Sequence, residues 1–412
     1  MTASDNDFPW RSVVTSIFLP TLLFSIGEGA ILPILPVVAS QLGSGLAGAG
    51  LIAAMVVVGE LVGDVPAGAI VSRVGERVSM IGAALLASIG VGVSLAAATP
   101  WVLGVGIFLI GLATSVFALA RHAFMTSYVP LTYRARALST LGGTFRLGYL
   151  IGPFLTAAVV SSTGEASSAF WIQLAGCAGT GIVLLLLRDP EASLRRPTMD
   201  AIADPGATEL AAESRGLLTT IRANGRVLAT VGTGSALVAA LRASRQVLLP
   251  LWAVSIGLGE TSTAVIIGIA GAVDFALFYA GGWIMDRFGR QWVAVPSMVG
   301  LGIGHLVLAA THDLPAPVAW FVAVAMFLSL ANGIGAGMLM TIGADLADPA
   351  DPAPFLGAWR FTNDSGAALA PLVISGVTAL ASLPAAAAVL GLMGLGGAAI
   401  LRRHLPRYST KP

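Results

Sequence analysis

Charged residues are scarce in this chain: they make up 10% of its 412 residues, whereas a typical soluble domain has about 25%. So few charges cannot cover a surface that faces water. A helix surrounded by lipid, in contrast, satisfies its backbone polar groups internally. The shortage of charge therefore excludes an ordinary soluble domain and predicts a protein whose main solvent is membrane lipid.

Cysteine and lysine are almost absent as well. The single cysteine, Cys177, excludes a disulfide framework and a cysteine-based metal site. The single lysine, Lys411, does not belong to a Gly-x-x-x-x-Gly-Lys-Ser/Thr nucleotide-binding pattern, so we expect energy to come from an ion gradient. The four histidines lack the spacing of metal ligands. We expect no metal, no cofactor, no enzyme activity and no nucleic acid partner.

Apolar residues dominate instead, at 56% of the chain. They form segments near or above the ~20 residues that cross the hydrocarbon core of a bilayer. Twelve helices are predicted: 12–39, 46–71, 78–98, 101–127, 137–161, 168–187, 230–256, 262–284, 291–311, 316–343, 357–381 and 384–401. A polar stretch from Arg188 to Arg226 separates the sixth from the seventh. We therefore predict an all-α membrane protein with an N-terminal six-helix bundle (1–187), a cytoplasmic central loop (188–229) and a C-terminal six-helix bundle (230–412).

Arginine is distributed unevenly between the two sides of these helices. The six loops on one side, from 40–45 to 382–383, contain no Arg or Lys, whereas the central loop and the loops on its side contain many. Positively charged loops stay in the cytoplasm. We therefore predict a multi-pass protein of the cell inner (plasma) membrane, with both termini in the cytoplasm.

The two halves of the chain repeat at a nearly constant offset. A shift of 214 residues superimposes Pro36 on Pro250, Gly68 on Gly282, Arg73 on Arg287, Gly75 on Gly289, Glu28 on Arg242 and Glu60 on Asp274. One offset that aligns prolines, glycines and buried charges indicates a parallel repeat of two bundles. Such repeats place a substrate site between the halves near mid-membrane, and rocking of one half on the other alternates access.

The turn after the eighth predicted helix has a distinctive pattern: Gly282, Asp286, Arg287, Gly289 and Arg290 follow the spacing Gly-x-x-x-Asp-Arg-x-Gly-Arg. This pattern resembles the loop signature of the major facilitator superfamily, and the resemblance covers nearly the whole chain. The resemblance implies the major facilitator fold, a small-molecule substrate, proton coupling and, by family default, a monomer. It also implies that the Asp of this loop pairs with a neighbouring helix end and holds the inward gate shut.

The first-half copy of the loop is degenerate. It retains Gly68, Arg73, Gly75 and Arg77, but Ser72 and Glu76 stand where Asp and a basic residue are expected. Asp64, about two turns earlier on the same helix, is a candidate replacement for the missing acidic group and a candidate gate residue.

Two further segments resemble proton-driven exporters. Pro33 and Pro36 are similar to the paired prolines of twelve-helix exporters, and Gly148-x-x-x-Gly152-Pro153 resembles the antiporter signature, whose last two glycines are replaced here. Close packing of small residues and a bend at Pro153 explain the second pattern equally well. The Arg-Gln-Gly pattern expected in helix 4 is missing, and we interpret Arg121 as a snorkelling residue near the cytoplasm.

Charged and polar residues near the middle of helices are the candidate proton- and substrate-binding groups: Glu28, Glu60, Arg146, Arg242, Arg245, Asp274, Asp364 and Asn332. A charge at the bilayer centre costs roughly 2.5–3.5 kcal/mol on insertion scales, so each needs a partner or a function. From the family's helix arrangement we predict that Glu28 pairs with Arg242 or Arg245, and Arg146 with Asp274. Glu60 and Asp364 would share the remaining interface, with Arg360 nearby.

Glu28 is the preferred proton or substrate-cation site, because Gly27 and Gly29 are expected to leave room around it. For the other charged residues, static ion pairs that lock the halves together are an alternative, and for Asn332 the alternative is close packing.

The leading interpretation is a proton-coupled exporter of small amphipathic compounds that works by alternating access. An alternative is a carrier for a polar metabolite, importing or exporting, with another coupling ion; the arginines at mid-membrane would then suit an anionic group. A non-transporting receptor is a different class, and the chain shows no large sensor domain that would support it.

Overall fold

The computed structural model describes residues 14–129, 131–186, 219–347 and 353–407, and within these ranges it consists of helices joined by short turns, with no strand. Eleven of its helices are long and apolar enough to cross a membrane. A further helix, α17 (Ala353–Leu380), reaches 28 residues and carries a polar stretch that includes Arg360 and Asp364. The predicted all-α membrane fold is therefore confirmed, with α17 as the twelfth helix.

The first bundle begins with one span built from four pieces: η1 (Val14–Phe18), α2 (Leu19–Ile31), η2 (Leu32–Ile34) and α3 (Leu35–Gln41). The 3₁₀ turn η2 follows from Pro33 and Pro36, because a proline cannot donate the backbone hydrogen bond of a regular helix. The rest of this bundle consists of α4 (Leu46–Val74), α5 (Glu76–Leu95), α6 (Pro100–Tyr128), α7 (Leu131–Thr163), η3 (Ala166–Ser168) and α8 (Ala169–Leu186).

The second bundle has the corresponding order. Its first span is α11 (Gly225–Val227), η4 (Leu228–Gly232) and α12 (Thr233–Ser255). It continues with α13 (Glu260–Phe288), α14 (Gln291–Ala310), α15 (Pro317–Ile334), α16 (Met338–Leu346), α17, α18 (Leu383–His404) and η5 (Leu405–Arg407). The predicted central loop lies mostly outside the described residues.

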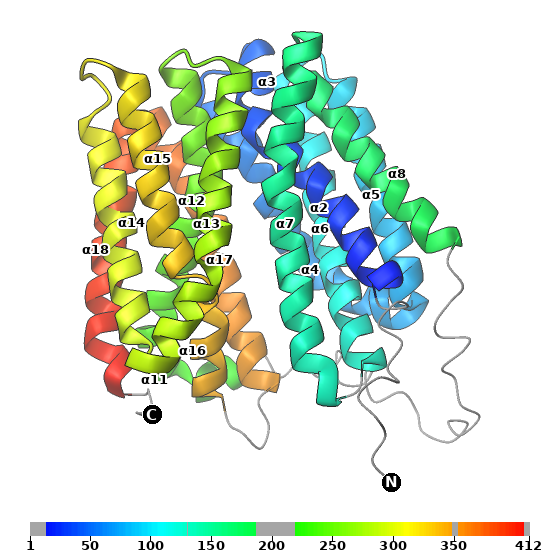
Figure 1. Cartoon of the computed structure of the whole chain (residues 1–412), viewed down its shortest axis with the longest axis vertical. Coiled ribbons are helices and arrows are strands. Elements are labelled where there is room, and N and C mark those ends of the chain that lie inside the picture. Colours follow the sequence, from blue (N-terminus) through cyan, green and yellow to red (C-terminus); the bar gives the residue numbers. More distant parts are fainter. Residues whose placement is uncertain (1–13, 130, 187–218, 348–352, 408–412) are drawn as a thin grey trace.

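The helices of the two bundles stand side by side as two groups (Figure 1). Helices α2 to α8 pack mainly on one another, as do α12 to α18. Between the groups, α7 packs on α13 and α4 on α17. We call the end of the molecule where α4 and α13 end, at Gly75 and Gly289, the terminal face, and the end with the turns at Gly43 and Gly257 the opposite face.

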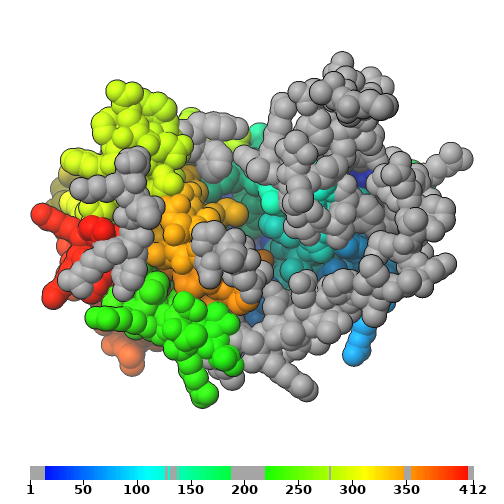
Figure 2. Space-filling view, turned by 90° about the horizontal axis from the view of Figure 1, so that it is seen from below, coloured from blue at the N-terminus to red at the C-terminus, as the bar shows by residue number. Residues whose placement is uncertain are grey.

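Direct contacts between the bundles gather toward the opposite face. Among the described residues they include the hydrogen bond from Gln41 Nε2 to Glu260 Oε1 (2.7 Å), the one from Ser375 Oγ to the Ala47 carbonyl oxygen (2.7 Å), the approach of Leu251 to Gly50, and that of the Phe154 ring to Gly268. Figure 2 views the terminal face, with the second bundle on one side and the described part of the first bundle on the other.

Glycines bring α7 into backbone contact with α2. A Cβ atom on Gly152 would lie 2.5 Å from the Ala30 nitrogen, and one on Gly148 would lie 2.5 Å from the Ser25 Cβ atom. No side chain fits at either position without a shift of one helix. The Gly148-x-x-x-Gly152 pattern therefore has a packing role, which fixes α7 against the helix that carries Glu28.

Candidate transport site

The first polar cluster is built around Glu28, in the middle of the first span. Its side chain is fully buried, and Oε1 accepts a 2.6 Å hydrogen bond from the Thr114 hydroxyl group of α6. Arg121 and Tyr149 lie within electrostatic range of the carboxylate. Oε2 has no hydrogen bond of ordinary geometry from the residues that the structure describes. Glu28 therefore sits inside the first bundle, between α2, α6 and α7.

Two predictions about Glu28 are wrong. The arginine within electrostatic range of its carboxylate is Arg121, and Arg242 and Arg245 contact other groups, described below. The flanking glycines leave no free room either, because Gly27 lies against Gln173 of α8 and a Cβ atom on Gly29 would lie 2.8 Å from the Tyr149 Cα atom. Their absent side chains let α7 and α8 approach α2.

Arg121 is a functional candidate that the sequence interpretation missed. Its side chain is 8% exposed, and its guanidinium carbon lies 4.7 Å from the centroid of the Phe145 ring. An arginine that snorkels to the membrane surface would be exposed, so that interpretation is wrong. The signal was present in the spacing, because Thr114 and Arg121 are seven residues apart and share one face of a helix.

A row of acidic residues on α4 faces α17. Glu60 lies within electrostatic range of Glu28, Asp64 and Asp364, and both Glu60 and Asp64 are within range of Arg360. Arg360 Nε also forms an ion pair with Asp364 Oδ2 at 3.3 Å, with side chains 51% and 42% exposed. The structure thus places Glu60, Asp364 and Arg360 along one interface, as the helix arrangement predicted.

The second polar cluster lies around Asp274, in the middle of α13. Its Oδ2 atom is 3.6 Å from Arg245 Nη1 and accepts a 2.6 Å hydrogen bond from Asn332 Nδ2. Arg245 Nη2 also donates to the Ser329 hydroxyl group at 2.7 Å. Arg146 of the first bundle lies within electrostatic range of Asp274, as predicted, but the direct ion pair is with Arg245.

A break in the tenth span completes this cluster. Helix α15 ends at Ile334 and α16 starts at Met338, and Gly337 between them has a φ of 81°. The Arg242 guanidinium group donates a hydrogen bond to the Gly335 carbonyl oxygen at the break. A positive charge at a helix C-terminus is favourable, because that end carries partial negative charge. Arg242 thus stabilises a discontinuous helix.

Over the described ranges, no group of three or more His, Cys, Asp and Glu side chains is arranged to hold a metal ion.

Comparison with known proteins identifies the family. The family model described as Major Facilitator Superfamily matches residues 17–291, which is more than half of the chain. The chain belongs to the major facilitator superfamily. The family and the fold are those of transporters rather than enzymes, and transporters of this superfamily bind small molecules and couple to ions such as protons.

Solved superfamily structures share the fold at low identity. A D-xylose-proton symporter is 16% identical with a TM-score of 0.72, covering 97% of this chain and 98% of that chain. A POT peptide transporter is 15% identical with a TM-score of 0.75 (99% and 96% covered). The inward open xylose transporter XylE from E. coli is 14% identical with a TM-score of 0.68 (97% and 97%). At these identities the likeness shows the fold alone.

One curated relative matches a shorter stretch. The glucose transporter HT1 of Trypanosoma vivax is 29% identical over an alignment of 148 residues that covers 34% of this chain. The chain spans about a quarter of that relative, 26% of its length.

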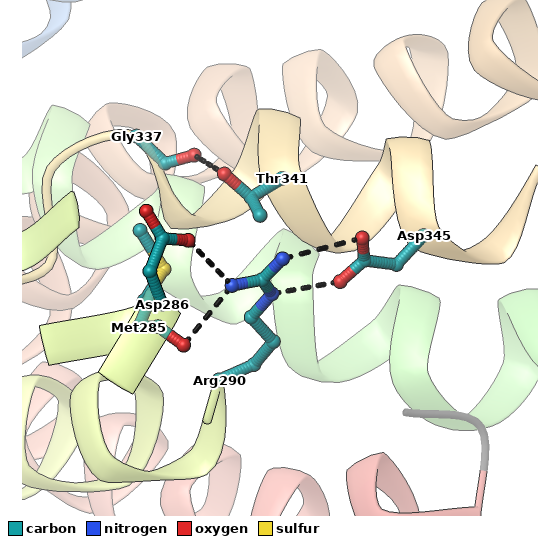
Figure 3. A network of polar contacts seen from close by, with 6 residues as sticks. All are labelled: Met285, Asp286, Arg290, Gly337, Thr341 and Asp345. Atoms are coloured by element: carbon teal, nitrogen blue, oxygen red, sulfur yellow. Dashed lines mark hydrogen bonds and ion pairs between the residues drawn. The ribbon is translucent and has the colours of Figure 1, made fainter. Parts of the chain in front are cut away.

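The superfamily loop lies at the terminal face, where Gly289 has a φ of 96° and ends α13. Arg290 Nε is 2.8 Å from Asp345 Oδ2 on α16, and Arg290 Nη1 is 3.1 Å from Asp286 Oδ1 (Figure 3). Hydrogen bonding to Asp345 raises the pKa of Arg290. The expectation that Asp286 itself pairs with a neighbouring helix is wrong, because Asp286 is 80% exposed and bonds within its own loop. The contact with α16 is made by Arg290, through its ion pair with Asp345.

The first-bundle copy of the loop makes a different contact, and the second bundle has an equivalent contact at the repeat offset. Arg77 donates to the Leu184 carbonyl oxygen at the end of α8. Gln291, 214 residues later, donates to the Arg402 carbonyl oxygen near the end of α18 at 3.0 Å. Both side chains therefore hold the last helix of their bundle at the terminal face. Asp64 lies within range of Arg360 across the interface, and its predicted gate role remains a prediction.

Proposed function

We propose that this superfamily member is a proton-coupled secondary transporter that exports a small amphipathic compound across the cell membrane by alternating access. The observation that carries the proposal is the buried Glu28 carboxyl group, with one oxygen bonded to Thr114 and the other without a hydrogen bond of ordinary geometry from the described residues. A fixed charge at this depth is costly, whereas a carboxyl group that gains and loses a proton can alternate between a charged and a neutral bundle interior.

The neighbouring groups give this proton site a partner and a path. Arg121 stabilises the charged form of Glu28, so protonation of Glu28 weakens an attraction between α2 and α6. Glu60 lies within electrostatic range of Glu28, and Asp64 is one turn nearer the terminal face on the same helix. We assign these carboxylates to proton movement between Glu28 and the terminal face, which we place in the cytoplasm.

The direction of transport rests on the resemblance of the Gly148–Pro153 segment to the antiporter signature. Gly148 and Gly152 belong to the segment that resembles the antiporter signature, and they fix α7 against the Glu28 helix. A movement of α7 during the cycle therefore moves the proton site, which suits exchange of a proton for a substrate.

The test uses proteoliposomes with a pH-sensitive dye inside and an imposed proton gradient. Lipophilic cations, neutral drugs and organic anions are added one at a time, and we expect proton flux that depends on one of these classes. Glu28→Gln should abolish this flux, because glutamine cannot release a proton. Glu165→Gln makes the same chemical change at an exposed position and should leave the flux intact. Normal, pH-dependent transport by Glu28→Gln would disprove the assignment.

A further inference from the structure

Helix α7 carries a pair of aromatic side chains beside the first polar cluster. Phe145 and Tyr149 lie one turn apart on this helix, and their ring centroids are 4.6 Å apart. The guanidinium carbon of Arg121 lies 4.7 Å from the centroid of the Phe145 ring. The Tyr149 hydroxyl group faces the Glu28 carboxyl group, and the Tyr149 backbone lies against Gly29. One helix thus places one aromatic side chain on Arg121 and another on Glu28.

Glu28 is surrounded by titratable groups from four helices. Among the described residues, those within electrostatic range of its carboxyl group are Arg121 of α6, Glu60 of α4, Tyr149 of α7 and Cys177 of α8. The further charged or titratable groups that face Arg121 are Glu60, Arg360, Tyr149 and His122. Arg121, through its charge, and Tyr149, through its hydroxyl proton, can stabilise a negative charge on Glu28.

Thr114 keeps a hydrogen bond in both protonation states of Glu28. Its hydroxyl oxygen is 2.6 Å from Glu28 Oε1 and 3.1 Å from the Ile110 carbonyl oxygen. A hydroxyl group both donates and accepts. Thr114 therefore donates to Glu28 when Glu28 is ionised. When Glu28 carries the proton, Thr114 accepts from it and donates to the Ile110 carbonyl oxygen instead.

Arg121 has no such substitute for the lost charge of Glu28. Its side chain is 8% exposed, and its Nε atom has no hydrogen-bond acceptor among the described residues. A buried charge whose counter-charge disappears is costly. The face of an aromatic ring attracts a cation, most strongly where both are shielded from water. The Phe145 ring therefore contributes most when Glu28 is neutral.

We infer that Phe145 and Tyr149 are positioning residues of the proton site and that they favour opposite protonation states of Glu28. The Tyr149 hydroxyl group stabilises the ionised carboxylate, and the Phe145 ring holds Arg121 when the carboxyl group is neutral. The proton itself binds to and leaves a Glu28 carboxyl oxygen. This inference rests on the proposed proton-coupled transport and adds the two residues that set the pH at which the site takes up its proton.

The aromatic pair also lies on a helix that borders the second bundle. Helix α7 packs on α13, and its Phe154 ring lies against Gly268 of that helix. Protonation of Glu28 changes what the side chains of Phe145 and Tyr149 contact, and so changes the forces on α7. The proton site inside the first bundle is thereby connected to the interface between the bundles.

The experiment titrates Glu28 directly in the purified full chain, without substrate. The infrared absorption of protonated carboxyl groups is recorded against pH, and the band that disappears in Glu28→Gln belongs to Glu28. Tyr149→Phe should move the midpoint of this band to higher pH by at least about one unit, because a hydrogen bond to a charged group is among the strong ones. Phe145→Leu should move it to lower pH by at least about half a unit, because the ring no longer holds Arg121.

Control variants separate the loss of the ring from altered packing. Phe145→Tyr retains an aromatic face and should keep the midpoint near the wild-type value. Phe327→Leu makes the same change as Phe145→Leu at a position on α15 that is 42% exposed, and it should leave the midpoint unchanged. If Phe145→Leu fails to fold, Phe145→Met replaces it, because the flexible methionine side chain fills irregular gaps.

The pattern of shifts decides the inference. Shifts of opposite sign in Tyr149→Phe and Phe145→Leu support it. Shifts of the same sign, or an unchanged midpoint in either variant, would overturn it and leave Glu28 as the proton site. Failure of the proposed function has a different signature, since Glu28→Gln would then retain proton flux in proteoliposomes. A wild-type protein without a band that depends on Glu28 would overturn both.

Discussion

Replacing Asp274 by asparagine removes the carboxylate that pairs with Arg245 without changing the shape of the side chain. Arg245 Nη1 lies 3.6 Å from Asp274 Oδ2, a separation at which two unit charges attract by about 5 kcal/mol at an effective dielectric constant of about 20. Breaking a buried pair on one side costs about 3–5 kcal/mol. Since the side chains of Arg245 and Asp274 are 11% and 22% exposed, we expect Asp274→Asn to lower the free energy of unfolding by an amount near the lower end of this range, about 3 kcal/mol.

A double-mutant cycle isolates the pair from other effects of the substitution. Asp274→Asn, Arg245→Gln and their combination are unfolded with SDS in mixed micelles. The combination should be more stable than the sum of the single losses predicts, because it leaves no unpaired charge from this pair. The same cycle with Arg146→Gln serves as the comparison and should show a smaller coupling. The assigned pairing would be refuted if Asp274→Asn lowered the free energy of unfolding by less than about 1 kcal/mol. It would also be refuted if the coupling energy of Asp274 with Arg146 exceeded that with Arg245.

Two further predictions concern helix packing and the loop. Gly152→Val should destabilise the protein by about 1–3 kcal/mol, because its Cβ atom would meet the Ala30 backbone at 2.5 Å. The control on the same helix is Gly142→Val, where no atom lies within 4 Å of the added Cβ; equal losses in SDS unfolding would contradict the packing argument. Arg290→Gln should change the free energy of unfolding by less than about 1 kcal/mol, since the ion pairs of Arg290 with Asp286 and Asp345 are partly exposed. The same variant should slow transport severalfold in proteoliposomes, because it removes the contact between α16 and the loop after α13. Transport at the wild-type rate would show that this contact does not limit the cycle.

The helices and the depth of the charges were predictable because both depend on short stretches of sequence. Long apolar segments must be helices in lipid, and Glu28 and Asp274 could be placed near mid-span by counting residues. The repeat offset likewise relates Arg77 to Gln291, whose side chains make equivalent contacts.

The pairing of the charges was not predictable in the same way. We expected Glu28 to pair with Arg242 because they occupy equivalent repeat positions, but equivalent positions face the interior of their own bundles. Glu28 therefore contacts Thr114 of α6, and Arg242 contacts Gly335 of the second bundle. Which helix faces which side chain depends on glycine contacts far apart in sequence, such as that of Gly29 with Tyr149.

The single cysteine makes this transporter well suited to distance spectroscopy. Cys177 is 1% exposed on α8, so thiol reagents reach it poorly in the folded protein. Val74 and Phe288 are 48% and 53% exposed at the ends of α4 and α13, one in each bundle and 214 residues apart. Spin labels on cysteines introduced at these two positions would follow the separation of the bundles at the terminal face, with little background from the native thiol.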